Sequence, residues 1–170
     1  MVTLGFILRA WPLFQACRSK AFAASMIWVF VGGGVSAAPL EILALSASSS
    51  SGMLMDAVDG DPQTRWQNKR PGEKDAWLAV RMKKATVLRG VRLDWGPHTD
   101  STQVFIEVSP QGEAFRRVLT VPKGVTPGPH TYVFSKALPA LYLRVRFQFT
   151  GPGTAPQFGI AELEPLGSED

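Results

Sequence analysis

The chain has 170 residues, of which 45% are hydrophobic and 19% are charged, with a formal net charge of +4. This length fits one domain with or without a leader, and the composition excludes a collagen-like or low-complexity chain. The single cysteine, Cys17, excludes a scaffold held by internal disulfides.

Residues 1–37 predict a secretory signal peptide. Residues 1–20 carry three basic side chains and no acidic one, and residues 21–35 are uncharged and mostly apolar. Val35-Ser36-Ala37 then provides the small-residue pattern of a signal peptidase site. The alternative is an uncleaved membrane anchor, but the apolar run is shorter than the ~20 residues that a spanning helix needs. We expect cleavage after Ala37 and a secreted or periplasmic protein.

Most of the positive charge lies in this leader. Its removal takes away three basic residues and no acidic one, so residues 38–170 carry a net charge of +1. A charge this small is not the electrostatic signature of a nucleic-acid-binding protein. Cys17 is removed as well, so the mature domain has no thiol for catalysis, zinc binding or a disulfide.

The first distinctive segment after the leader is an acidic turn, Asp56–Trp66. It follows a Ser-rich stretch and contains three aspartates and one threonine around a Gly-Asp-Pro sequence. Carboxylates this close together repel one another unless they are solvated or bridged by a cation. Carboxylate, hydroxyl and carbonyl oxygens are also the ligands that Ca²⁺ takes. On these residues alone, an exposed acidic turn and a metal site fit equally well.

The segments after the acidic turn predict short β-strands. In residues 141–149 apolar side chains alternate strictly with the others, so that Arg144 and Arg146 share the outward face. This period of two is typical of a strand buried on one side. Similar runs lie at residues 77–82, 91–95 and 104–108. Because Gly- and Pro-rich turns separate the runs, we expect an all-β sandwich or barrel.

Six segments in this order resemble a discoidin domain. They are AVDGDPQTRW, WLAV, VLRGVRLDW, IEVSPQGEAF, LYLRVRF and FGIAELEP, which together span about residues 42–166. Discoidin domains, also called coagulation factor 5/8 type C domains, include the family 32 carbohydrate-binding modules. The resemblance implies an eight-stranded β-sandwich of jelly-roll type over residues 38–170, which agrees with the strand pattern.

The resemblance also implies a structural Ca²⁺ ion, because many members of the family hold one between the acidic turn and a glutamate near the C-terminus. Carried over by position, the ligands are the carbonyls of Asp56 and Ala161, the carboxylates of Asp59 and Glu162, and oxygens of Asp61 and Thr64. Trp66 and Trp77 are implied to pack in the core beneath the turn. Binding of the ion would stabilise the folded domain.

The family binds ligands through loops at one end of the sandwich, where an aromatic ring and a few charged or amide side chains hold a sugar. Here the resemblance implies Phe158 as the aromatic residue. His98 and Asp100, two positions apart in one loop, suit a diol, but such a pair is more commonly part of a solvated turn. Arg70 in a further polar loop could bind an anionic sugar or a phosphate, or be an ordinary exposed arginine.

The residues do not predict an enzyme. His98 and His130 are the only histidines, and neither lies in a serine-hydrolase or zinc-protease motif. We therefore expect a non-catalytic module that recognises a cell-surface or extracellular glycan.

The alternative function is an adhesion or assembly module that binds an envelope protein or a membrane surface. Met53-Leu54-Met55 could form an apolar tip that enters a membrane, but no basic residue flanks it. We expect this segment to pack into the core beneath the acidic turn, and we do not expect membrane contact.

Overall fold

The computed structural model describes residues 38–69, 72–95 and 102–169. The elements are β1 (Ala38–Pro39), β2 (Ile42–Ala47), the short 3-10 helix η1 (Leu54–Ala57), β3 (Trp66–Gln67), β4 (Asp75–Trp95), β5 (Thr102–Ser109), β6 (Arg116–Val121), β7 (Gly128–Phe149) and β8 (Gly159–Glu169). Within these residues no helix is long and apolar enough to cross a membrane. The leader predicted for residues 1–37 lies outside the described residues.

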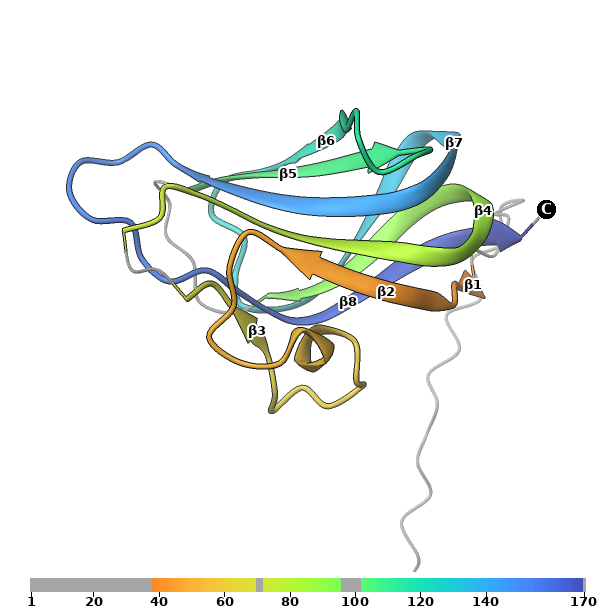
Figure 1. Ribbon diagram of the computed structural model, residues 1–170. Helices are drawn as coiled ribbons and strands as arrows, with labels where there is room; N and C mark the ends of the chain where they lie inside the picture. The colour runs from red at the N-terminus through yellow and green to blue at the C-terminus, as the bar shows by residue number, and fades with distance from the viewer. Residues whose placement is uncertain (1–37, 70–71, 96–101, 170) are drawn as a thin grey trace, which may run out of the picture. The chain divides into compact units, whose positions relative to one another are not determined.

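The two long strands, β4 and β7, contribute to both layers of a sandwich (Figure 1). The first half of β4 pairs with β2 and with the second half of β7, which continues through β5 to β6. The second half of β4 pairs with β8 and with the first half of β7. The β4–β7 register shifts between Arg81 and Thr86, where the pair passes from one layer to the other. The eight strands are all paired antiparallel, which confirms the predicted all-β sandwich.

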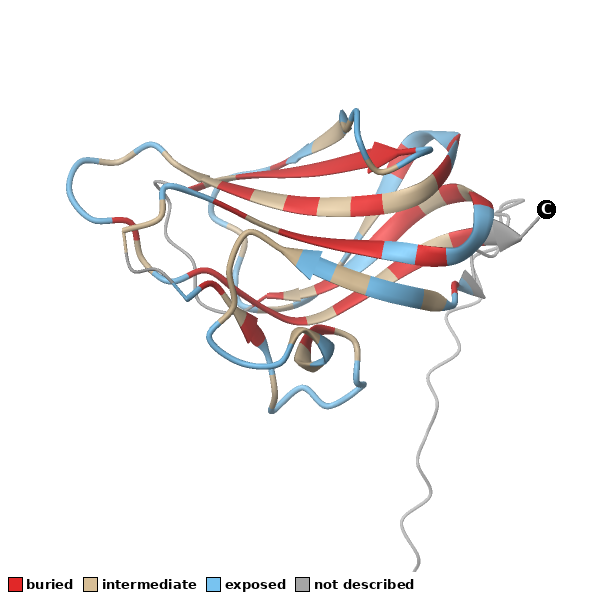
Figure 2. Cartoon of the chain, viewed as in Figure 1, coloured by how far each residue is buried: buried red, intermediate tan, exposed pale blue. Residues whose placement is uncertain are grey.

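Alternation along the strands buries one face of each layer in a common core (Figure 2). In β7, Leu143, Val145 and Phe147 are fully buried, whereas Arg144 and Arg146 on the opposite face remain partly exposed. The alternation predicted for this strand is therefore confirmed.

An aromatic cluster lies at one end of this core, with Phe147 at its centre. The Phe147 ring centroid lies 5.1 Å from that of Phe158, 6.1 Å from that of Trp95 and 6.2 Å from that of Trp66. The buried indole N–H of Trp66 donates to the carbonyl of Ser49 (3.1 Å). Four segments that are distant in the sequence therefore meet at one ring.

β5 departs from the predicted alternation, because it is buried on both faces. Phe105 and Glu107, the outward residues of this run, are only 2% and 4% exposed. The guanidinium of Arg117 lies over the Phe105 ring, 3.5 Å from its centroid, and Arg144 binds Glu107. Arginines of the neighbouring strands thus cover the outer face of β5.

Phe147→Ala tests the aromatic cluster. Removing a fully buried ring at the meeting point of three others should lower the free energy of unfolding by about 3–5 kcal/mol, measured by urea denaturation. Val133→Ala, at a position in β7 that is 73% exposed, should change it by less than about 0.5 kcal/mol. Equal effects of the two substitutions would contradict a core centred on Phe147.

Candidate functional site

The acidic turn follows η1 and is shaped by its own side chains. Gly60 has a φ of 79°, a left-handed conformation that glycine adopts without strain. The amide of Asp61 donates to Oδ1 of Asp59 (3.0 Å), and the amide of Gln63 donates to Oδ1 of Asp61 (2.9 Å). These short-range hydrogen bonds fix the turn locally.

Several oxygen atoms of this turn converge on the hydroxyl of Thr64. Its Oγ1 lies 3.0 and 2.9 Å from the two carboxylate oxygens of Asp59, 2.9 Å from the carbonyl oxygen of Asp61 and 3.4 Å from that of Asp56. A hydroxyl has one proton to donate, so it cannot satisfy all of these acceptors. The surplus of oxygen atoms is the chemistry that a hard cation prefers.

Glu162 of β8 reaches the same turn. The amide of Gly60 donates to Oε2 of Glu162 (3.1 Å). Burial raises the pKa of Glu162 above its usual value, and the negative charges of Asp59, Glu164 and Asp94 raise it further, while the hydrogen bond from Gly60 acts in the opposite direction. The structure thus joins the acidic turn to the last strand and disfavours the ionised form of Glu162.

Ala161 lies at an irregular position of β8. Asp94 pairs with Glu162 and Trp95 pairs with Ile160, so Ala161 is an extra residue without a register partner on β4. Within the described part of the chain, no three His, Cys, Asp or Glu side chains are grouped so that they could hold a metal by themselves. A cation at this turn would therefore depend on backbone and hydroxyl oxygens as well as on carboxylates.

A hollow of about 960 Å³ opens beside the turn, between β2, η1 and β8. Asp59, Gly60 and Glu162 line it, together with apolar side chains such as Leu43, which is 54% exposed. Ions in the solvent therefore have access to these carboxylates.

The segment Met53-Leu54-Met55 also borders this region, but it does not pack into the core as predicted. Met53 and Met55 are 71% and 56% exposed, and only Leu54 is partly buried. A 3-10 helix has three residues per turn, so Leu54 and Ala57 share the inward side of η1 and the methionines point elsewhere. The prediction is wrong for the two methionines.

The ends of three strands meet at one end of the sandwich. Thr102 pairs with Phe149, and the amide of Phe149 donates to the carbonyl of Lys74 (2.8 Å). Lys74 just before β4, the first residue of β5 and the last residue of β7 therefore lie next to one another. Three of the predicted ligand contacts, Arg70, His98 and Asp100, lie outside the described residues.

Phe158 is the predicted ligand contact that the structure does describe, and its side chain is fully buried. Its ring stacks on Phe147 at an interplanar angle of 12°, and its amide donates to Oδ1 of Asn68 (2.8 Å). Because neither face of the ring reaches the surface, Phe158 cannot serve as a stacking platform for a sugar. We correct this prediction: the residue supports the loop from within the core.

Asn68 was not singled out from the sequence, although it holds two of these loops together. It is fully buried, its amide donates to the carbonyl of Phe158 (3.2 Å), and its carbonyl accepts from Nε2 of Gln157 (3.2 Å). An asparagine in a polar loop carries no sequence signal of this role, because its partners lie 89 and 90 residues away.

Trp66 and Trp77, which the resemblance places in the core beneath the turn, differ in burial in the structure. Trp66 is fully buried, but Trp77 is only partly buried. Its neighbours Ala76 and Leu78 point into the core, so the alternation of β4 directs Trp77 to the outer face. The prediction of a core position for Trp77 is wrong. The period of two in residues 77–82 already places Trp77 on the face opposite to Leu78.

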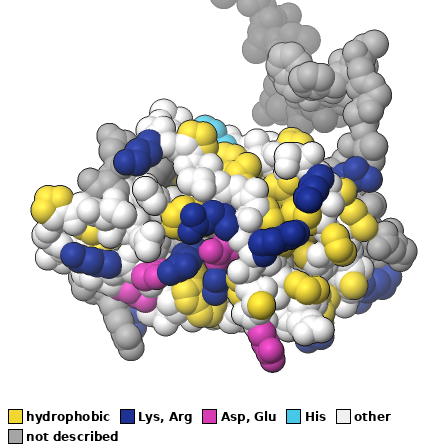
Figure 3. Space-filling view, turned by 90° about the horizontal axis from the view of Figure 1, so that it is seen from above, with side chains coloured by type: hydrophobic (Ala, Val, Ile, Leu, Met, Phe, Trp, Pro, Cys, Tyr) yellow, Lys and Arg dark blue, Asp and Glu magenta, His cyan; other side chains and the backbone are white. Residues whose placement is uncertain are grey.

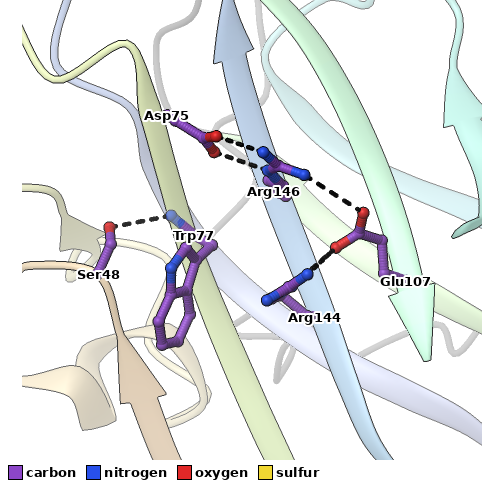
Figure 4. A network of polar contacts seen from close by, with 6 residues as sticks. All are labelled: Ser48, Asp75, Trp77, Glu107, Arg144 and Arg146. Atoms are coloured by element: carbon purple, nitrogen blue, oxygen red, sulfur yellow. Dashed lines mark hydrogen bonds and ion pairs between the residues drawn. The ribbon is translucent and has the colours of Figure 1, made fainter. Parts of the chain in front are cut away.

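Trp77 borders a polar hollow of about 400 Å³ on this outer face, lined by Asp75, Trp77, Arg144 and Arg146. Figure 4 shows these side chains, with the ion pairs of Arg144 and Arg146 to Glu107 and of Arg146 to Asp75. The sequence placed the two arginines outward, but it could not connect them with Asp75, which is 71 residues from Arg146.

Known protein families and structures share this fold. A comparison with curated proteins finds no match. Among solved structures, chitosan-binding module 1 of a chitosanase/glucanase from Paenibacillus sp. IK-5 is 26% identical, with a TM-score of 0.63, and the match covers 76% of this chain and 97% of that one.

Two further similar structures are carbohydrate-binding modules. The family 32 module of AlyQ, in complex with 4,5-unsaturated mannuronic acid, is 20% identical with a TM-score of 0.63, over 77% of this chain and 99% of that one. The family 32 module of NanJ from C. perfringens, in complex with galactose, is 22% identical with a TM-score of 0.61, over 77% and 98%. A family model for the F5/8 type C domain matches residues 44–162, and the protein therefore belongs to the F5/8 type C, or discoidin, domain family.

Proposed function

We propose that the protein is a secreted, non-catalytic module that recognises a carbohydrate through the loops at one end of its sandwich. The main support is the similarity to the chitosan-binding module, which this chain matches over 97% of that module's length. The modules of AlyQ and NanJ, whose structures contain sugars, are likewise matched almost completely. The matched region of this chain thus corresponds to a binding module and not to a catalytic domain. A signal peptide over residues 1–37 would carry the protein to the periplasm or the exterior.

The proposed ligand contacts are His98, Asp100 and Arg70, which would hydrogen-bond the hydroxyl groups of the sugar. Near this end of the sandwich, buried Asn68 joins the chain after β3 to the chain before β8 through its hydrogen bonds with Phe158. This contact supports the proposed location of the ligand site.

The same proposal includes a structural Ca²⁺ ion at the acidic turn. The residues present fit this ion, because the oxygen atoms around Thr64 outnumber the protons available to them. Its ligands would come from Asp56, Asp59, Asp61 and Thr64 in the turn and from Ala161 and Glu162 in β8. Positive charge at this place would favour ionised Glu162, and the binding free energy would add to the stability of the fold.

The double substitution His98→Ala/Asp100→Ala tests the ligand site. On a glycan array the wild type should select one related group of sugars, and the variant should lose at least about tenfold in affinity for them. Val133→Thr, on an exposed part of β7, should bind as the wild type does. If the wild type binds no sugar, carbohydrate recognition is excluded; if the variant binds normally, the site lies elsewhere.

Glu162→Gln tests the calcium site. The substitution should lower thermal stability when Ca²⁺ is present, and it should not lower it when Ca²⁺ is absent. Ca²⁺ at 100 times its dissociation constant should stabilise the wild type by about 2.7 kcal/mol, a rise in Tm on the order of 5–10 °C. The variant should lose most of this rise. Glu113→Gln, in an exposed turn, should keep it.

When a chelator removes Ca²⁺ at neutral pH, the difference in Tm between the wild type and Glu162→Gln should disappear or reverse. Because the folded state raises the pKa of Glu162, ionisation of this group lowers stability as the pH rises through that pKa. Glu162→Gln should therefore melt at or above the wild-type temperature at pH 7, and this advantage should disappear near pH 4. A wild-type Tm that does not respond to either Ca²⁺ or chelator would exclude the ion.

A further inference from the structure

We propose that the outer face of the layer containing β4, β7, β5 and β6 is a second carbohydrate-binding surface, and that it takes an acidic, uronate-containing polysaccharide. This inference extends the proposed glycan recognition to another face of the sandwich and does not require the site at the loop end. We call this surface the arginine face. Its side chains are those of Asp75, Trp77, Arg81, Phe105, Glu107, Phe115, Arg117, Tyr142, Arg144 and Arg146.

The arginine face carries an excess of positive charge. Its charged side chains are four arginines and two acids, Asp75 and Glu107, which gives a net charge of +2. The side chain of Glu107 is only 5% exposed, whereas those of Arg144, Arg146 and Asp75 are 20%, 29% and 44% exposed. Figure 3 looks onto this side of the molecule and shows Lys and Arg side chains gathered around the acidic ones. An anionic ligand would be attracted to such a surface.

The two central arginines are held in fixed positions. Nε of Arg144 donates to Oε2 of Glu107 (2.7 Å), and Arg146 binds both carboxylate oxygens of Asp75 (Figure 4). The hydrogen bond from Arg146 holds the pKa of Asp75 below its usual value, and the same contact raises the pKa of Arg146. The contact therefore favours the ionised forms of Asp75 and Arg146, and the ion pairs orient both arginines.

These ion pairs leave part of each guanidinium unused. Nη1 of Arg146 lies 3.9 Å from Oε1 of Glu107, beyond hydrogen-bond distance, and Nη1 of Arg144 has no acceptor among the residues that the structure describes. The two arginines line the hollow of about 400 Å³ on this face. Two preformed donors beside an open hollow match the carboxylate and hydroxyl groups of a uronic acid.

Aromatic side chains stand on both sides of Arg144. Its guanidinium lies 4.0 Å from the ring centroid of Phe115 and 5.8 Å from that of Trp77. Phe115 belongs to the β5–β6 turn, in which Gly112 packs so close to the Tyr142 ring that a Cβ atom there would lie 2.9 Å from it. The C–H face of a sugar ring can stack on Trp77 while its carboxylate reaches the neighbouring guanidinium.

The strand pairing favours a polysaccharide over an acidic peptide. β4 and β7 have hydrogen-bonded neighbours on both sides in this layer, and β5 lies between β7 and β6. Their backbone groups are therefore already paired, so a peptide could not add a strand here. Recognition on this face has to use side chains, which suits the hydroxyl, carboxylate and C–H groups of a sugar.

Affinity electrophoresis in gels that contain polygalacturonate, with a neutral galactan as the comparison, tests this inference. Polygalacturonate should retard the wild type more strongly than galactan does, and the retardation should decrease as salt is added. Trp77→Ala and Arg146→Gln should each weaken it about tenfold. Asp75→Asn should strengthen it, because it removes a negative charge from the face and one of the two acceptor oxygens that bind Arg146.

Arg92→Gln is the matched control, because it makes the same charge change on the second half of β4, where the side chain is 57% exposed. Its retardation should equal that of the wild type. Arg144 is left intact, since its removal would leave buried Glu107 without its closest partner. Thermal melting of every variant checks folding, and if Arg146→Gln is unfolded, Trp77→Ala and Asp75→Asn still decide the result.

Three outcomes would overturn the inference: polygalacturonate binding that Trp77→Ala leaves unchanged, equal losses in Arg146→Gln and Arg92→Gln, or equal retardation by the neutral galactan.

The variant His98→Ala/Asp100→Ala separates this inference from the proposed function. This variant should retain polygalacturonate binding, although it no longer binds the sugars that the wild type selects on the glycan array. If only His98→Ala/Asp100→Ala loses polygalacturonate binding, all binding belongs to the loop end and the inference is overturned.

Discussion

The antiparallel pairing of β4 with β7 is the constraint on which the remaining structure depends. The two strands run together through both layers, from the pair Asp75–Gln148 to the pair Trp95–Gly128, and every layer is built on one of their halves. The same register decides which residues of the two strands point inward. Phe147 enters the core, whereas Arg146 and Trp77 face outward. A shift by one residue would exchange these faces.

The carboxylates of the arginine face and those of the acidic turn have different partners. On the outer face, both carboxylates, Asp75 and Glu107, have an arginine of β7 as an ion-pair partner, and each arginine keeps donor groups that these pairs do not use. At the acidic turn, the described contacts of Glu162 and Asp59 are with backbone amides and a hydroxyl, and the pKa of Glu162 is raised. The second arrangement is the one that calls for a cation, which is why we assign the proposed metal to the turn and an organic ligand to the arginines.

The two proposed binding surfaces place different demands on the fold. The loop end needs support from below, and the buried ring of Phe158 and the buried amide of Asn68 provide it by anchoring two flanking loops. The arginine face needs no loops, because side chains of paired strands are already ordered by the sheet. An aromatic ring placed outward on a strand, as Trp77 is, can therefore contribute to recognition as directly as a ring in a loop.

The sequence by itself determined the strand periodicity and the local turn chemistry. The period of two in residues 141–149 and the aspartates around Gly60 act over a few residues, so both are visible in the order of the side chains. Tertiary structure alone decided which distant segments meet: Gly60 with Glu162, Asp75 with Arg146, and Phe158 with Phe147. The physical reason is that alternation specifies which face a residue occupies, whereas strand pairing and packing decide what that face meets.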